Sequence, residues 1–202
     1  MEGSPTVIVL AAGQGLRFRQ SGGTTHKLDA PLAGLPVLQH VLRTVAASGL
    51  PFHVVRPLRT GADGASGGAN AQGDGMGDSI ARGVLATAQS PGWLIVPGDL
   101  PLVRADSLLQ VAQCLRAAPV VVPQWQGQPG HPVGFTASCR AALAALCGDV
   151  GAAAIVRAHR LGGTLQVLAL DDPGVVTDID TVADLAHAES QLRTAPVSVS
   201  QE

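Results

Sequence analysis

Strand-like apolar runs alternate with helical segments along most of the chain. The helical segments are 10 to 15 residues long, and strands separated by helices of that length usually form a parallel sheet covered on both faces. The sequence therefore predicts an α/β fold, a Rossmann-like three-layer α/β/α sandwich with a mainly parallel sheet. The expected strands are 6–12, 52–56, 93–99, 119–124 and 164–170, and the expected helices are 37–48, 78–89, 104–118 and 181–192.

The same pattern predicts where a ligand binds and where the domain ends. In an open parallel sheet, ligands bind beyond the carboxyl ends of the strands, and unusual polar segments follow the first and third expected strands. A chain of 202 residues fits one domain, which we place at residues 1–193. We expect residues 194–202 to form a flexible tail and the glycine-rich segment 60–77 to form a long mobile loop.

Charge and cysteine usage exclude several classes of function. Charged residues make up only 14% of the chain and the net charge is -2, whereas nucleic-acid binding needs a clustered basic face. No signal peptide and no apolar run of about 18 residues is present, so we expect neither secretion nor a membrane. The cysteines, Cys114, Cys139 and Cys147, lack metal-ligand spacing and are expected to be core or half-buried thiols. A reducing cytoplasm fits this composition.

The loop after the first strand predicts a phosphate-rich ligand. It lies within the stretch "VIVLAAGQGLRFRQSGGTTHKL", residues 7–28. Gly13 and Gly15 let the backbone approach an anion closely, and Arg17 and Lys27 add positive charge. The stretch matches neither the Walker A pattern nor the dinucleotide fingerprint, which would need a glycine where Phe18 stands. The alternative is a glycine-rich turn with solvated Arg and Lys side chains.

Two acidic segments are candidates for a magnesium site. Asp99 follows the third strand in "IVPGDLPLV", where it either holds Mg²⁺ or caps the turn before Pro101. In "VVTDIDTVADL", Asp178 and Asp180 occupy alternate positions and share a face if the segment is extended. Thr181 and Asp184 form an imperfect capping box for the last helix, which leaves Asp178 without a structural task.

Three further motifs suggest ligand contacts. His131, between Gly130 and Pro132, either donates to a phosphate of an acceptor or holds its own loop through backbone contacts. Asp149 is either a ligand contact or the N-cap of the following helix. Ser79 begins the helix after the glycine-rich segment, where its hydroxyl suits a base or ribose.

The motifs together resemble the superfamily of nucleotidyltransferases that activate a phosphorylated acceptor with a nucleoside triphosphate. The motifs are "LAAGQGLRF" followed by "HKL", then "GMGDS", "GDLP", "GHPVGF", "GDVGA" and "DIDTVADL", in the order that is usual for the superfamily. The resemblance implies a fold of the nucleotide-diphospho-sugar transferase type. It also implies nucleotide contacts by Leu10, Ala11, Ala12, Gly13, Gly15, Arg17, Lys27, Ser79 and Asp99, with Lys27, Arg17 and Asp99 catalytic. Magnesium would be held by Asp99 with Asp180 or Asp178, and the acceptor by Gly130, His131, Pro132 and Asp149.

Within the superfamily, the chain is most similar to the molybdenum cofactor cytidylyltransferase group. Members that use GTP generally have LAGG where this chain has "LAAG", and the methyl of Ala12 crowds a purine more than a pyrimidine. The resemblance implies CTP and the molybdopterin cofactor as substrates and a molybdoenzyme of the xanthine dehydrogenase type as a partner. Alternatives are a sugar or alcohol phosphate acceptor, GTP as the donor, and a non-catalytic carrier of the cofactor. Ala153 replaces an arginine of the usual motif, and Arg157 lies one helical turn later.

Overall fold

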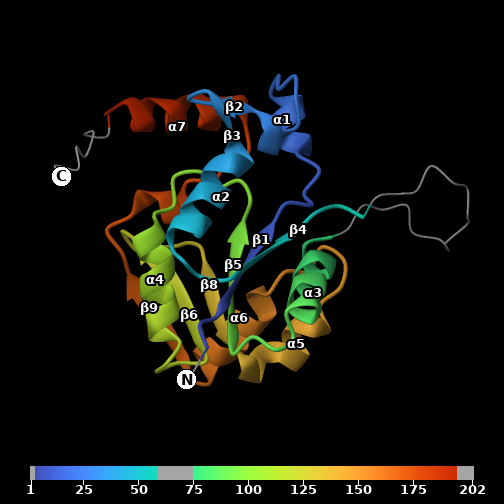
Figure 1. Cartoon of the computed structure of the whole chain (residues 1–202), viewed down its shortest axis with the longest axis vertical. Coiled ribbons are helices and arrows are strands. Elements are labelled where there is room, and N and C mark those ends of the chain that lie inside the picture. Colours follow the sequence, from blue (N-terminus) through green and yellow to red (C-terminus); the bar gives the residue numbers. More distant parts are fainter. Residues whose placement is uncertain (1–2, 59–74, 195–202) are drawn as a thin grey trace, which may run out of the picture.

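The computed structural model describes residues 3–58 and 75–194 and has a central sheet of seven strands between layers of helices (Figure 1). Most of the predicted loop 60–77 and of the predicted tail lies outside the described residues. Five strands pair in parallel in two groups. One group has the order β4 (Phe52–Val55), β1 (Thr6–Leu10) and β5 (Gly92–Pro97), and the other is β6 (Val120–Trp125) beside β9 (Leu165–Ala169). The predicted mainly parallel sheet is confirmed.

One antiparallel strand joins the two parallel parts of the sheet. β8 (Val133–Thr136) lies between β5 and β6 and runs antiparallel to both. β6 is the first arm of a hairpin, and the short β7 (Gln128–Pro129) and β8 together form the return arm. Residues 130–132 separate β7 from β8. This strand was not predicted, because its four residues include a glycine and show no alternation of apolar and polar side chains.

Helices cover both faces of the sheet, which confirms the three-layer prediction (Figure 1). Side chains of β1 show the reason: Val7 and Val9 enter one core, Ile8 between them enters the other, and all three are fully buried. The first core packs under α2 (Val37–Ala47), α4 (Ala105–Cys114) and α7 (Val182–Thr194). The second packs under α3 (Met76–Ala86), α5 (Arg140–Ala144) and α6 (Ala153–Leu161).

Short elements shape the upper edge of the molecule, where the strands end. They are α1 (Leu16–Gln20), the 3-10 turn η1 (Lys27–Asp29), the hairpin of β2 (Pro31–Leu32) and β3 (Leu35–Pro36), and the 3-10 turn η3 (Pro173–Val176). The 3-10 turn η2 (Ala137–Cys139) follows the antiparallel β8 and lies at the opposite edge, where the Ala137 amide donates to the Pro91 carbonyl at 2.9 Å. The sequence predicted a loop where α1 lies, and the side chain of Phe18 is only 2% exposed because α1 packs it into the core.

A buried carboxylate joins η3 to α4. Asp172 accepts hydrogen bonds from the Ser107 hydroxyl at 2.6 Å, from the Arg104 amide at 3.0 Å and from the Gly174 amide at 2.9 Å. The bond from Arg104 satisfies an amide donor at the start of α4 that the helix itself leaves unpaired. The segment that leads from η3 toward Asp180 is therefore attached to the helical layer.

Cys139 is buried and Cys114 is half-buried as expected, but Cys147 is exposed, because α5 ends at Ala144 and leaves Cys147 in a loop.

Among residues 3–58 and 75–194, no helix combines the length and the apolar character that crossing a membrane requires.

Candidate functional site

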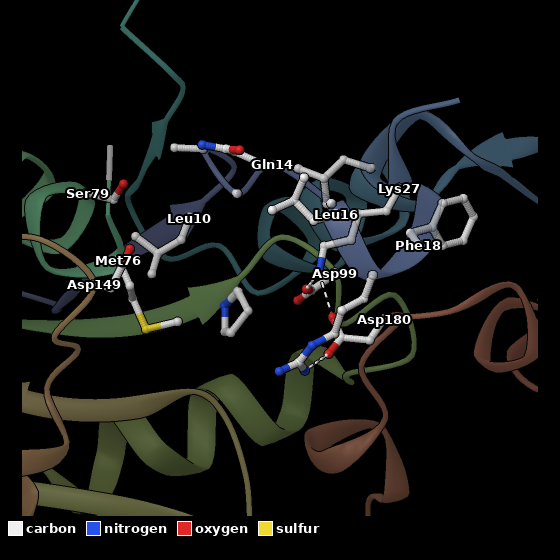
Figure 2. Close-up of a pocket in the computed structure, with 16 residues that line it drawn as sticks. Leu10, Gln14, Leu16, Phe18, Lys27, Met76, Ser79, Asp99, Asp149 and Asp180 are labelled. Atoms are coloured by element: carbon white, nitrogen blue, oxygen red, sulfur yellow. Dashed lines mark hydrogen bonds and ion pairs between the residues drawn. The ribbon is translucent and has the colours of Figure 1, made fainter. Parts of the chain in front are cut away.

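The loop after β1 and the loop after β5 form one cavity at the carboxyl ends of these strands. The Gly98 amide donates to the Leu10 carbonyl at 2.9 Å, which holds the two loops together. The cavity has a volume of about 530 Å³ (Figure 2). Its walls come from the glycine-rich loop that follows β1 and contains Gly13 and Gly15, from η1 and from the start of α3. The segments that carry Asp99, Asp149 and Asp180 complete the walls. The lining residues predicted from the sequence are Leu10, Ala12, Gly13, Gly15, Arg17, Lys27, Ser79, Asp99, Asp149 and Asp180.

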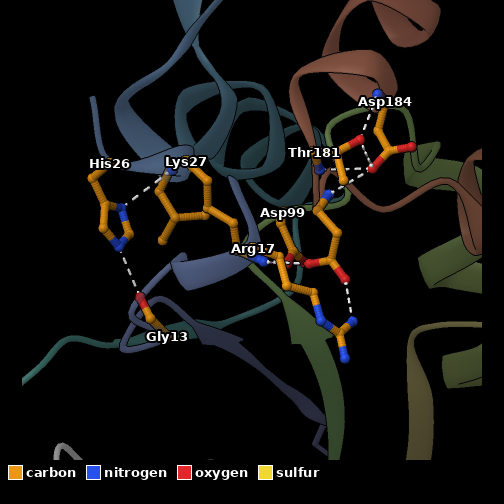
Figure 3. Close-up of polar contacts among 9 residues, drawn as sticks. Gly13, Arg17, His26, Lys27, Asp99, Thr181 and Asp184 are labelled. Atoms are coloured by element: carbon orange, nitrogen blue, oxygen red, sulfur yellow. Dashed lines mark hydrogen bonds and ion pairs between the residues drawn. The ribbon is translucent and has the colours of Figure 1, made fainter. Parts of the chain in front are cut away.

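Lys27 joins the two acidic segments at one end of the cavity (Figure 3). Its ammonium group donates to Asp99 Oδ2 at 2.5 Å and to Asp180 Oδ1 at 2.9 Å. The Arg17 guanidinium donates to the other oxygen of Asp180 at 2.9 Å. The Lys27 side chain is only 13% exposed and that of Arg17 is 79% exposed. Lys27 is thus buried between two carboxylates, whereas Arg17 is largely exposed and pairs with Asp180 alone.

The charges of this cluster stabilise one another. Burial alone would lower the pKa of Lys27, but the carboxylates of Asp99 and Asp180 more than offset it and hold that pKa above its ordinary value. Hydrogen bonding by Lys27, with a further contribution from Arg17, lowers the pKa of Asp180 despite partial burial. Both side chains therefore remain charged through the neutral range.

His26 connects the segment that carries Lys27 to the glycine-rich loop. Its Nδ1 accepts from the Leu28 amide at 3.3 Å, so Nε2 carries the proton and donates to the Gly13 carbonyl at 2.8 Å. Gly15 has a left-handed backbone with φ of 62°, and a Cβ there would stand 3.3 Å from Lys27 Cγ. The seven residues 19–25 complete α1 and a turn, and Lys27 still reaches both carboxylates.

The segment that carries Asp180 is fixed on both sides. The Ile179 amide donates to the Asp99 carbonyl at 3.0 Å, and Ile179 is fully buried. The Asp184 carboxylate accepts from the Thr181 amide at 2.7 Å and from the Asp180 amide at 3.1 Å. The Thr181 hydroxyl accepts from the Asp184 amide at 3.2 Å, which is the capping arrangement that the sequence predicted for the last helix.

The other end of the cavity is formed by the start of α3 and the loop 147–151. The Gly77 amide donates to the Gly148 carbonyl at 2.8 Å, and Asp78 accepts from the Gly75 amide at 3.1 Å. Amide donors of the helix start are therefore already used, so this end does not match a phosphate site. Figure 2 shows Met76, Ser79 and Asp149 at this end, across the cavity from Lys27, Asp99 and Asp180.

Only one of the four residues predicted to bind an acceptor lines the cavity. Asp149 lines the cavity, whereas Gly130, His131 and Pro132 do not. The alternative that Asp149 caps the next helix is wrong, because α6 begins at Ala153 with Ala152 as its N-cap. Arg157, considered as a replacement for the missing arginine, is exposed on α6 and does not line the cavity.

His131 lies near enough to Asp99 and Asp178 to feel their charges, but it does not line the cavity. Its backbone amide donates to the Val175 carbonyl at 2.8 Å, so backbone contacts hold this loop. Burial lowers the pKa of the imidazole, although the charges of Asp99 and Asp178 oppose that shift. Among the described residues, His131 Nδ1 and Asp99 Oδ1 are both buried without a hydrogen-bond partner. A ligand that binds Asp99 would therefore meet free lone pairs.

Asp178 and Ala11, two further residues of the predicted site, lie outside the cavity lining. Partial burial, together with the charges of Asp99 and Asp180, raises the pKa of Asp178, and its side chain does not line the cavity. Ala11 is 6% exposed and packs in the core beside the loop. Within residues 3–58 and 75–194, no group of three His, Cys, Asp or Glu side chains is placed to hold a metal ion. A metal held by Asp99 and Asp180 would take its further ligands from substrate oxygens or water.

The sequence reasoning missed several residues of this site. His26 was quoted as part of "HKL" but was given no role, although its position beside Lys27 was a usable signal. The missed lining residues are mostly apolar and give no sequence signal for a ligand: Gln14, Leu16, Phe18, Leu28, Met76 and Pro97.

Comparison with known proteins gives a family match over most of the chain. The model of the MobA-like NTP transferase domain matches residues 7–163. The bifunctional protein GlmU of Xanthomonas euvesicatoria is 31% identical over 136 residues, which are 62% of this chain and 29% of GlmU. The chain thus matches less than a third of the length of this curated relative.

Solved structures share the fold at low sequence identity. A nucleotidyl transferase from Methanothermobacter is 23% identical with a TM-score of 0.75, covering 95% of this chain and 99% of that one. A Mycobacterium tuberculosis protein solved in complex with manganese is 23% identical with a TM-score of 0.66, covering 93% and 98%. Molybdopterin-guanine dinucleotide biosynthesis protein A from Archaeoglobus fulgidus is 14% identical with a TM-score of 0.58, covering 93% and 98%.

Proposed function

The chain belongs to the family of MobA-like NTP transferase domains, and from this premise we propose that it is a CTP:molybdopterin cytidylyltransferase. The proposed reaction transfers the cytidylyl group of CTP to the terminal phosphate of the molybdopterin cofactor. The products are the cytosine dinucleotide form of the cofactor and pyrophosphate.

The observation that carries the proposal is the Lys27 cluster beside the glycine-rich loop. A buried ammonium held by Asp99 and Asp180, with Arg17 exposed next to it, places two cationic groups and two carboxylates that suit a divalent cation at one end of a cavity of about 530 Å³. The phosphates of a nucleoside triphosphate are the part of CTP that such charge attracts. His26 keeps the loop and Lys27 together, so the charges need little rearrangement when the ligand binds.

The chemistry needs no nucleophilic side chain from the protein. An oxygen of the acceptor phosphate attacks the α-phosphorus of CTP, a new P–O bond forms, and the bond to the leaving pyrophosphate breaks. The attacking phosphate is already ionised near neutral pH. Lys27 and Arg17 would bind the triphosphate and offset the charge that develops on its oxygens, so catalysis comes from positioning and charge stabilisation.

The acidic residues suit a divalent cation shared with the substrate. Asp99 Oδ1 is buried and unpartnered among the described residues, and the carboxylate of Asp180 lies across Lys27 from Asp99. Hard carboxylate oxygens fit Mg²⁺, which commonly takes one or two protein carboxylates plus phosphate oxygens. Asp99 and Asp180 would hold it, and bound Mg²⁺ would neutralise triphosphate charge. We propose Asp180 over Asp178, whose side chain does not line the cavity.

The acceptor and the donor base are chosen from the sequence motifs and the site. "LAAG" and the motifs around His131 and Asp149 favour CTP and the molybdopterin cofactor. A sugar phosphate acceptor is the second candidate, because a solved structure that shares the fold, with 12% identity and a TM-score of 0.71, is that of a putative glucose-1-phosphate thymidylyltransferase from Bacillus anthracis. A carrier without activity is disfavoured, because a carrier has no need for the Lys27–Asp99–Asp180 arrangement.

The test is pyrophosphate release by the purified protein with Mg²⁺ and the molybdopterin cofactor. CTP, GTP and UTP are compared, and glucose 1-phosphate replaces the cofactor in a parallel reaction. We expect release only with CTP and the cofactor, and its loss in Asp99→Ala but not in Asp106→Ala, which changes an exposed aspartate on α4. Release only with the sugar phosphate would select the second candidate, and no release in any reaction would contradict both.

A further inference from the structure

The two ends of the cavity differ in chemistry. Lys27 and Arg17 supply positive charge at one end. The opposite end combines apolar side chains with the hydroxyl of Ser79 and the carboxylate of Asp149 (Figure 2). The carboxylates of Asp99 and Asp180 balance these two charges, and Mg²⁺ held there would make this end attractive to a triphosphate, whereas the unpaired carboxylate of Asp149 repels a triphosphate from the other end. A nucleotide oriented by these charges places its base at the end formed by α3 and the loop 147–151.

Asp149 is exposed and unpaired at the base end. Its carboxylate makes no hydrogen bond or ion pair with any other residue in 3–58 or 75–194, although its backbone is closely held. Gly148 has a left-handed backbone with φ of 58°, and its carbonyl accepts from the Gly77 amide at 2.8 Å. A Cβ on Gly75 would stand 2.0 Å from that carbonyl oxygen, so the loop lies directly against the start of α3. Asp149 is therefore presented to the cavity from a fixed backbone.

An ionised carboxylate only accepts hydrogen bonds, so its ligand must offer a donor. Cytosine carries an amino group at position 4, whereas uracil carries an oxygen there and would face the carboxylate with an acceptor. An acceptor contact is less consistent with the structure, because the other residues predicted for the acceptor, Gly130, His131 and Pro132, do not line this cavity.

We propose that Asp149 is a specificity-determining residue that accepts a hydrogen bond from the 4-amino group of cytosine and so selects CTP over UTP. The inference rests on the proposed function in one respect, that the cavity binds CTP. It adds a residue that discriminates between two pyrimidines of equal size, which the packing around Ala12 cannot do.

The test is equilibrium binding of CTP and of UTP, measured by calorimetry with Mg²⁺ and without the acceptor. Asp149→Asn keeps the shape of the side chain and adds an N–H donor that suits the 4-oxygen of uracil. We expect the preference for CTP over UTP to fall by about tenfold in this variant, because one hydrogen bond to a charged group is lost. Asp106→Asn is the control, since it removes an exposed aspartate on α4, and it should keep the wild-type preference.

The other outcomes overturn the inference in distinguishable ways. Equal weakening of CTP and UTP would place Asp149 on the ribose. Unchanged binding of both nucleotides in Asp149→Asn would leave the proposed function intact and remove Asp149 from the base site. Failure of the wild-type protein to bind CTP at all would contradict the proposed function together with this inference.

Discussion

Lys27 is the only lysine of the 202-residue chain, and it lies where three segments meet. Asp99 is 72 positions away from it in the sequence and Asp180 is 153 positions away. Because the ammonium is only 13% exposed, its charge acts on the cavity with less screening by water than that of a surface lysine. Single substitutions in this cluster should therefore affect activity strongly.

We predict that Lys27→Met lowers kcat/KM by roughly a hundred- to a thousandfold, as is typical when one charge-stabilising donor is removed. Methionine keeps the length of the side chain and removes its charge. Steady-state pyrophosphate release is the measurement. The matched control is Arg193→Met, which removes a cation that pairs with Glu189 on the surface of α7. Equal activity in wild type and Lys27→Met would exclude Lys27 from the chemistry.

The pKa shifts predict a pH window for the contribution of the cluster to stability. Asp180 has its pKa lowered below 3.8, so its stabilisation is complete above that value and is lost as the pH falls through the folded-state pKa. Lys27 has its pKa raised above 10.5, so its stabilisation is complete below that value and is lost at more alkaline pH.

The corresponding measurement compares wild type with Asp180→Asn by urea unfolding in EDTA. The difference in free energy of unfolding should stay constant between about pH 5 and about pH 9 and shrink as the pH approaches the folded-state pKa of Asp180. Asp106→Asn controls for the loss of an aspartate without these partners. A difference in free energy of unfolding that grows toward acid pH would contradict a lowered pKa of Asp180 in the folded state.

At the scale of elements, the contact between α3 and the loop 147–151 positions the base end of the cavity. A Cβ on Gly77 would stand 2.5 Å from the Val150 carbonyl oxygen and 2.8 Å from that of Cys147. Both neighbours are backbone atoms and cannot turn aside as a flexible side chain would. Glycine is needed here for close approach, and the helix start and the loop behave as one unit.

We predict that Gly77→Ala lowers the free energy of unfolding by roughly 1–3 kcal/mol and weakens CTP binding, because the helix and the loop must separate. Gly162→Ala is the matched control, since the nearest atom to its Cβ would be 3.4 Å away and its backbone is not left-handed. Urea unfolding and calorimetry measure the two effects. Wild-type stability in Gly77→Ala would show that this contact is not required.

At the scale of the whole molecule, the cavity draws its walls from residues 10–28, 76–79, 97–99, 149 and 180. These segments belong to both helical layers and to the central sheet (Figure 1). Binding at such a junction requires all of them to be folded. A ligand that binds there should therefore stabilise the whole fold and not one element alone.

We predict that CTP with Mg²⁺ raises the free energy of unfolding by about 2.7 kcal/mol at roughly a hundred times its Kd. The measurement is urea unfolding at increasing concentrations of CTP. Without ligand, Asp99→Ala should be folded and should unfold cooperatively in urea. Its free energy of unfolding should rise much less than that of the wild type when CTP is added. Stabilisation that is equally large in Asp99→Ala would mean that CTP binds elsewhere.

The extent to which the sequence predicted the site can be followed from individual residues. Gly13, Arg17, Lys27 and Asp99 were predictable because each lies in a contiguous motif directly after a strand, and all of them line the cavity. Met76 and Leu16 were not, because an apolar side chain at a ligand site has the same sequence pattern as one in the core. His26 acts through a hydrogen bond to a carbonyl, and any residue type offers a carbonyl.

The sequence by itself determined the alternation of strands and helices, because the spacing of apolar residues reports which local face is buried. It also determined the local motifs around the glycine-rich loop, Asp99 and Thr181. Only the tertiary structure decided that β8 enters the sheet in the antiparallel direction, that Lys27 meets Asp99 and Asp180, and that Asp149 shares a cavity with Ser79. These contacts join residues far apart in the sequence, and such contacts depend on strand order and packing, which local periodicity does not encode.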